Sequence, residues 1–261
     1  MEQGPRARIA ALRNSHDRLA SLVAPLTPEQ LRGPAYPTEW SIAQVLSHVG
    51  SGAEIALLTL PAALGQGEPV GRDAFPPIWD AWNAKSPDDQ AADALSTDEK
   101  HVRALEQLSD DDLARISLSL FGMTLDSEGL IGLRLGEHAL HTWDVAVSLD
   151  PAARVSPDAV SLLIDNVPGF LAPRLGRPPD VPFRIRVRAS DPDRDYLLVA
   201  SDPISMPDWP GDGDGADSEV AMPAEALLRL AYGRLDPEHT PAEVTADAAD
   251  LDRLRKLFPG F

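Results

Sequence analysis

Cysteine is absent from this sequence of 261 residues. Its absence excludes disulfide bonds, thiolate metal ligands and cysteine nucleophiles. Any thiol chemistry would have to use a thiol carried by another molecule. Basic residues are also scarce, with 23 Lys plus Arg against 41 Asp plus Glu and a net charge of −18. A field of this sign repels nucleic-acid phosphates and anionic membrane surfaces, so neither is an expected partner.

Long apolar runs are missing too. The most apolar stretch covers residues 55–64 and is interrupted by Thr59 and Pro61, whereas a helix that crosses a bilayer needs about 18 or more apolar residues. The N-terminal residues lack the apolar core of a secretion signal. We therefore expect a cytoplasmic protein. Hydrophobic residues make up 43% of the chain, enough for a sizeable core.

Apolar residues in the first part of the chain recur at helical spacing. The pattern predicts helices over residues 6–24, 38–65 and 126–149. Over residues 75–112 it predicts a helix, a kink at Ser86-Pro87 and another helix that starts there. Amphipathic helices joined by short connections suit an antiparallel four-helix bundle. His16 lies on the apolar stripe of the first helix, where we expect a partly buried, hydrogen-bonded structural histidine.

The pattern changes after Pro151. Residues 183–188 alternate between apolar and basic side chains, which is typical of a half-buried strand, and residues 196–200 form its expected hairpin partner. Short strands are expected near 219–221 and 243–245, helices over 156–171, 223–232 and 251–258, and a solvated acidic loop over 208–217. We therefore predict an α+β protein with a four-helix bundle over residues 1–151 and a smaller α+β domain over 152–261.

Glu137 and His141 lie four residues apart, so their side chains leave the same helix face one turn apart and can share one ion. His48 would complete a metal site if its helix packs beside this face. Catalytic zinc sites use three His or carboxylate ligands and keep a fourth position for water or substrate. Two alternatives stay open at this point: a solvated face around Glu137, and a structural role for His48.

The chain contains the segments WSIAQVLSH at 40–48 and EHALHTWDV at 137–145. In sequence and in order, these two segments resemble motifs of the mycothiol-dependent maleylpyruvate isomerase family of the DinB-like superfamily. The C-terminal half, with LLRLAYGR at 227–234, is similar to the family's α+β C-terminal domain. The resemblance implies a DinB-like four-helix bundle that binds a divalent metal, usually zinc, through His48, Glu137 and His141. It also implies mycothiol, the cysteine-containing thiol of actinobacteria, as the cosubstrate.

Three further residues are candidates for catalysis. Arg134 and Arg234 could bind a substrate carboxylate, because a guanidinium group pairs with a carboxylate in a two-pronged way. Asp144 follows His141 by three residues and could orient its imidazole. A surface charge is the alternative for each arginine, and solvent exposure is the alternative for Asp144. His138 is the competing ligand if the helix is rotated.

The resulting hypothesis is a metal-dependent enzyme that activates mycothiol for attack on a small-molecule electrophile. It would act as a thiol S-transferase or as a cis-trans isomerase, and the ligand motif does not choose between them. A non-catalytic ligand-binding or regulatory protein of the same fold is the alternative, and a purely structural helical protein is a third.

Overall fold

The computed structural model describes the chain except residues 1–3, 38, 121, 212–214 and 261. It divides into two compact units, residues 1–155 and residues 156–261. The first is helical apart from one small hairpin, and the second combines a mixed sheet with helices. The predicted α+β fold class is confirmed. The sequence had placed the boundary between the units after residue 151.

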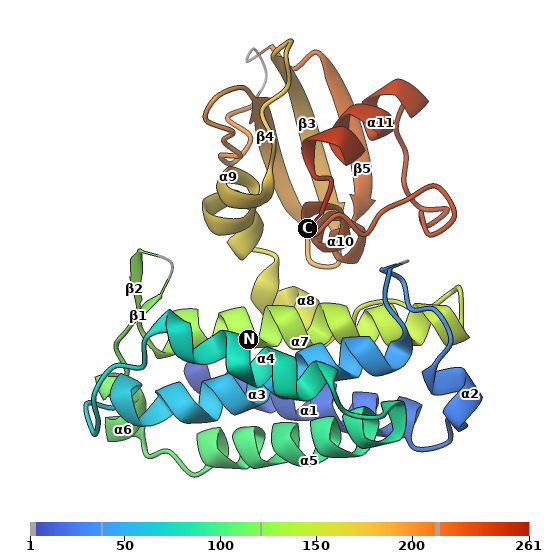
Figure 1. Cartoon of the computed structure of the whole chain (residues 1–261). Coiled ribbons are helices and arrows are strands. Elements are labelled where there is room, and N and C mark those ends of the chain that lie inside the picture. Colours follow the sequence, from blue (N-terminus) through green and yellow to red (C-terminus); the bar gives the residue numbers. More distant parts are fainter. Residues whose placement is uncertain (1–3, 38, 121, 212–214, 261) are drawn as a thin grey trace. The chain divides into compact units, whose positions relative to one another are not determined.

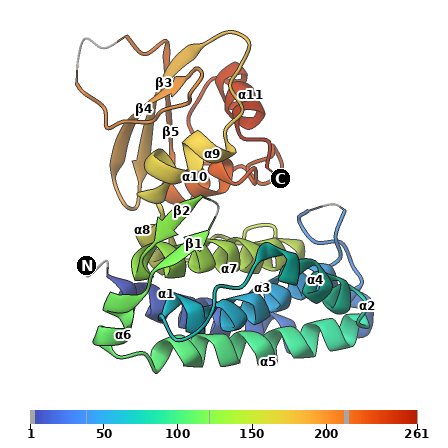
Figure 2. The same ribbon diagram turned by 60° about the vertical axis from the view of Figure 1, so that its left-hand side comes forward.

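Four long helices form the first unit and lie side by side in Figures 1 and 2. Their apolar faces meet in a common core, and the most extensive contacts join α3 to α5 and α1 to α7. This arrangement confirms the four-helix bundle predicted from helical periodicity. The helices are α1 (Pro5–Val23), α3 (Ile42–Ala63), α5 (Pro87–Glu106) and α7 (Ser127–Leu149).

Capping residues confirm the break predicted at Ser86-Pro87 and add a second break, at Ser109, that was not predicted. Ser86 accepts a hydrogen bond from the backbone of Asp89 at 3.2 Å and starts α5, and Ser109 starts a further helix in the same way. The 75–112 stretch therefore holds separate helices. The shorter helical elements of this unit are α2 (Pro28–Leu31), η1 (Arg72–Ala74), α4 (Phe75–Asn83) and α6 (Asp110–Arg115).

A capping box sets the start of α3. Ser41 Oγ accepts from the backbone N–H of Gln44 at 3.2 Å, and Gln44 Oε1 accepts from the N–H of Ser41 at 2.8 Å. The helix therefore begins at Ile42. The predicted start at Thr38 lies outside the described residues. Among the described residues, α3 alone is long and apolar enough to cross a membrane by length and composition, a test that bundle-core helices also pass.

A small hairpin before α7 was missed by the sequence analysis. Strands β1 (Leu118–Leu120) and β2 (Met123–Leu125) pair antiparallel around Gly122, which has a φ of +75°. Three-residue strands are too short to show the alternation that marks a strand in a sequence. No helix or strand was predicted between residues 112 and 126, so the hairpin adds an element and contradicts no prediction.

The second unit is built on the sheet order β4-β3-β5, with β3 antiparallel to β4 and parallel to β5. Helix α11 lies over one face of this sheet (Figures 1 and 2). The predicted strand at 243–245 is wrong, since only Thr245 pairs with the sheet, as an isolated bridge to Ala221. Residues 212–214 of the predicted acidic loop lie outside the described residues. The elements are α8 (Pro157–Leu163), η2 (Val167–Leu171), α9 (Ala172–Leu175), β3 (Phe183–Ser190), β4 (Arg194–Ala200), β5 (Ser218–Pro223), α10 (Ala224–Ala231) and α11 (Ala248–Leu257).

Gly50 marks the closest approach of α3 to its neighbours. A Cβ at this position would lie 2.4 Å from the ring of Trp82 and 2.9 Å from Cα of Ala94. We expect Gly50→Ala to lower the free energy of unfolding by about 1–3 kcal/mol, because the helices must move apart. Urea denaturation measures this change. Gly67→Ala, where a Cβ meets only ordinary contacts beyond 3.5 Å, is the control and should stay within about 0.5 kcal/mol. Equal effects would contradict the packing argument.

Candidate metal centre

The three predicted metal ligands come together between α3 and α7. His48 Nε2 lies 3.3 Å from Glu137 Oε2, and His141 Nε2 lies 3.6 Å from the same oxygen. One ligand atom from each residue lies within 4.8 Å of the others. Helix α7 supplies Glu137 and His141 from successive turns, and α3 supplies His48. The three residues that the family resemblance implied therefore lie together.

These separations fit ligation of one ion. Bonds of about 2.0–2.2 Å in a tetrahedral arrangement place neighbouring ligand atoms about 3.3–3.6 Å apart. The side chains of His48 and Glu137 are 40% and 46% exposed, while that of His141 is 10% exposed. The group thus has one buried member and two that solvent can reach, as a site with an exchangeable position requires.

The protonation states also suit a metal. Burial lowers the pKa of His48, and the neighbouring His141 adds to this effect against the opposing pull of Glu137. Burial opposes ionisation of Glu137, but hydrogen bonds and attraction from His141 and His48 outweigh it and hold the pKa of that carboxyl well below its usual range. A carboxylate beside a neutral imidazole is the form in which these groups bind metal ions.

Asp144 contacts His141 from the side away from the other ligands. Its Oδ2 lies 2.8 Å from His141 Nδ1, and its side chain is fully buried. An Nδ1–H that donates to Asp144 leaves the lone pair of Nε2 directed toward Glu137. Carboxylates hold metal-binding histidines in this way in many proteins. The alternative of a solvent-exposed Asp144 is wrong.

We expect Asp144→Asn to weaken metal binding at this centre by about tenfold, because the neutral amide holds and polarises the His141 ring less strongly. Competition with a chromogenic chelator measures the affinity. Ser148→Ala is the matched control, since Ser148 lies one turn further along α7 and its hydroxyl donates to the backbone carbonyl of Asp144 and not to its carboxylate. An unchanged affinity in Asp144→Asn would contradict the orienting role.

Trp40, from the first resembling motif, forms one wall of the centre. Its ring lies 5.5 Å from that of His48 and is stacked on that of His141 at 6.3 Å. The two histidine rings are 4.6 Å apart. The indole therefore limits how far either imidazole can turn, and it presents an apolar surface beside the ligand atoms.

The two candidate arginines lie in different units. Arg134 is largely buried, and its Nη2 donates to Asp98 Oδ1 at 2.7 Å and to the carbonyl of Val49 at 3.0 Å. The alternative of a surface charge is wrong for Arg134. Arg234 belongs to the second unit, where it is buried and its Nη1 donates to the carbonyl of Tyr232 at 3.0 Å. The roles of both toward a substrate carboxylate stay predictions.

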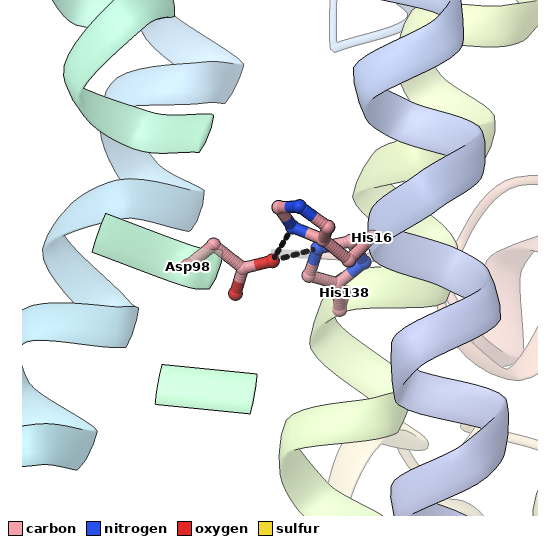
Figure 3. Close-up of side chains that lie close together, drawn as sticks. All are labelled: His16, Asp98 and His138. Carbon is pink, nitrogen blue, oxygen red and sulfur yellow. Dashed lines mark hydrogen bonds and ion pairs between the residues drawn. The ribbon is translucent and has the colours of Figure 1, made fainter. Parts of the chain in front are cut away.

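A second cluster lies inside the bundle and was not found from the sequence. Figure 3 shows the carboxylate of Asp98, on α5, facing the rings of His16 on α1 and His138 on α7. His16 Nδ1 and His138 Nε2 each lie 2.8 Å from Asp98 Oδ2, and all three residues are buried. This group could also hold a metal ion by its composition and spacing. His16 is confirmed as a buried, hydrogen-bonded histidine.

The burial of residues on α7 and α5 tests the solvated-face alternative and shows how Asp98 could have been predicted. His138 and Asp144 have no exposed surface, and His141 is 8% exposed. The interpretation of this face as solvated is therefore wrong for these three residues, whereas the side chain of Glu137 is 46% exposed. His138 joins the interior cluster and not the group around Glu137. Asp98 lies one turn before Val102 on the apolar stripe of α5, and an acid on such a stripe is the signal that could have revealed it.

The fold and site define a two-unit α+β protein with a His-Glu-His group on a helical bundle. The family profile of the mycothiol maleylpyruvate isomerase N-terminal domain matches residues 12–146, and that of the MDMPI C-terminal domain matches residues 154–253. The chain belongs to the mycothiol maleylpyruvate isomerase family.

Two solved structures share the fold. The crystal structure of a mycothiol-dependent maleylpyruvate isomerase superposes with a TM-score of 0.68 at 15% identity, covering 94% of this chain and 93% of that chain. A histidine-to-alanine mutant of such an isomerase gives 0.65 at 15% identity, covering 89% and 90%. No curated protein sequence matches this chain significantly. At this level of identity the likeness shows the fold alone.

Proposed function

We propose that this protein is a divalent-metal-dependent enzyme that activates mycothiol for attack on a small electrophile. The observation that carries the proposal is the convergence of His48, Glu137 and His141 at ligand spacing on an accessible side of the bundle. Family membership and the shared fold with a mycothiol-dependent isomerase support it. Two imidazoles and one carboxylate form a donor set that suits zinc, the metal we propose.

The chain's own residues would hold and orient the reacting groups. A bound divalent ion with an open coordination position favours the deprotonated form of a thiol that binds there. Because the chain has no cysteine, the sulfur has to come from a small molecule. His48, Glu137 and His141 provide the ligand atoms, Asp144 fixes the tautomer of His141, and Trp40 limits the rotation of both rings.

The reaction starts when the thiolate sulfur forms a bond to one carbon of a cis double bond that is conjugated to a carbonyl group. The displaced electron pair moves onto the carbonyl oxygen, and the former double bond can rotate. When the C–S bond breaks, the electrons return, the thiolate is released and the trans product remains. If the adduct instead takes up a proton and leaves, the outcome is S-transfer. Arg234 stays a proposed partner for a substrate carboxylate.

A product screen tests this proposal. The zinc-loaded protein is incubated with mycothiol and a panel of electrophiles that includes maleylpyruvate, and mass spectrometry with chromatography detects trans isomers and S-adducts. We expect a product that requires zinc, mycothiol and His48, with His48→Ala as the inactive comparison. Equal product formation by His48→Ala would contradict the proposal. Tight metal and mycothiol binding without turnover of any electrophile would favour the non-catalytic alternative.

A further inference from the structure

The carboxylate of Asp98 connects all four helices of the bundle. Asp98 belongs to α5 and is fully buried. Its Oδ2 contacts His16 on α1 and His138 on α7. Its other oxygen, Oδ1, accepts from Nη2 of Arg134 on α7 at 2.7 Å. The same Nη2 donates to the carbonyl of Val49 on α3 at 3.0 Å. A single interior acid therefore links α3, by way of Arg134, to the other three helices.

The distances in this cluster are those of hydrogen bonds. Both imidazole nitrogens lie 2.8 Å from Asp98 Oδ2, which is a hydrogen-bond length and is shorter than the separation of about 3.3–3.6 Å between neighbouring ligands of one ion. His138 Nδ1 lies 2.8 Å from the hydroxyl of Ser15, so the ring can accept there and donate through Nε2 to Asp98. The guanidinium of Arg134 already supplies a positive charge next to this carboxylate.

Arg134 meets α3 beside a proposed ligand. Val49, whose carbonyl accepts from Arg134, directly follows His48, and Arg134 lies one turn before Glu137 on α7. Gly52 makes room for the guanidinium, because a Cβ there would lie 2.8 Å from Arg134 Nη1. The contact thus joins α3 and α7 at the level where one helix supplies His48 and the other supplies Glu137.

We propose that Asp98 and Arg134 are positioning residues for the candidate metal centre. Asp98 anchors the guanidinium of Arg134, and the bond from Arg134 to the carbonyl of Val49 holds His48 at ligand distance from Glu137. This inference rests on the proposed function, because it assumes that His48 and Glu137 bind the same ion. It also assigns the buried cluster to hydrogen bonding, so that the chain binds one divalent ion and not two.

Gly52→Ala is the most selective test variant. It removes no ligand and no buried charge, and alanine favours the helix more than glycine does. The added Cβ nonetheless displaces the guanidinium of Arg134. We expect the affinity for Co²⁺, measured by chelator competition on the full chain, to fall about tenfold or more, as when an outer partner of a metal ligand is lost. The visible absorption bands of bound Co²⁺ should shift, and far-UV circular dichroism of the variant checks that the bundle stays folded.

Asp98→Asn provides a second test, because it keeps the side-chain shape and removes the charge that anchors Arg134. Leu31→Ala is its control, since Leu31 is buried on α2 outside this network and its truncation destabilises the bundle without touching Arg134. We expect Asp98→Asn to bind Co²⁺ about tenfold or more weakly and Leu31→Ala to keep the affinity of the unmodified protein. If the role of Asp98 were purely structural, the two variants would not differ in their affinity for Co²⁺.

Two results would overturn the inference while leaving the proposed function intact. The first is Co²⁺ binding by Gly52→Ala and Asp98→Asn with unchanged affinity and unchanged spectra. The second is a stoichiometry of two ions per chain, with one lost in His16→Ala, which would make Asp98 a metal ligand. Failure of the unmodified protein to bind Co²⁺ at all would overturn the proposed function and this inference with it.

Discussion

Replacing His48 with alanine is expected to lower the affinity for Zn²⁺ by more than about 100-fold. Loss of an outer partner of a metal-binding histidine costs about 10–100-fold, and this substitution removes a ligand itself. The remaining pair, Glu137 and His141, comes from a single helix and leaves the cation with only two protein ligands. Elemental analysis after dialysis, together with chelator competition, measures the change.

His239→Ala is the matched control for that experiment. His239 belongs to the second unit, where its Nδ1 lies 2.8 Å from Asp236, and its removal should leave zinc content and affinity unchanged. Stoichiometric, tight zinc binding by His48→Ala would contradict the ligand assignment. So would equal losses in the two variants, because they would point to a nonspecific effect of removing a histidine.

Replacing Asp98 with alanine is expected to lower the free energy of unfolding by about 3–5 kcal/mol. The substitution leaves the guanidinium of Arg134, 11% exposed, without its carboxylate, and removes the shared acceptor of two buried imidazoles. Breaking a buried ion pair from one side costs this much because the other charge stays buried and unpaired. Urea denaturation, followed by far-UV circular dichroism, measures the loss.

The adjacent acid on α5 supplies the comparison. Glu99 is 28% exposed and pairs with the partly exposed Arg13 and the exposed Arg103. Its Oε2 also lies 3.2 Å from Nε2 of His16. Because solvent screens these pairs, Glu99→Ala should cost no more than about 1 kcal/mol. A large difference between these neighbouring substitutions is the expected result. Similar losses, or a loss below about 1 kcal/mol for Asp98→Ala, would show that the interior network contributes little to stability.

Helical periodicity predicted the bundle because each long helix buries one apolar face. Neither Asp98 nor its neighbour Glu99 was singled out from the sequence. Both are acids in a polar stretch, and only the phase of α5 places one inside and the other at the surface. The local sequence pattern can show that Asp98 lies on the buried side of its helix, but not which residues it contacts. Its partners belong to other helices: His16 is 82 residues away and His138 is 40 residues away.

At the candidate metal centre too, the local sequence predicted contacts within one helix but not the contact between helices. Four-residue spacing predicted that Glu137 and His141 share a face, and the structure places them on successive turns of α7. His48 is 89 residues from Glu137, and nothing in its local sequence sets that distance; the resemblance of two motifs supplied it. The prediction of a strand at 243–245 was wrong because two β-branched residues, Val244 and Thr245, are too short a pattern to distinguish a single bridge from a strand.

Titration of the cobalt-substituted protein with mycothiol tests the central claim most directly. If His48, Glu137 and His141 hold one ion with a position open to sulfur, a thiolate-to-cobalt absorption band should appear in the near ultraviolet and saturate at one mycothiol per bound cobalt. The His48→Ala variant should show no such band. Stoichiometric cobalt in the unmodified protein, with a spectrum that saturating mycothiol leaves unchanged, would contradict the account.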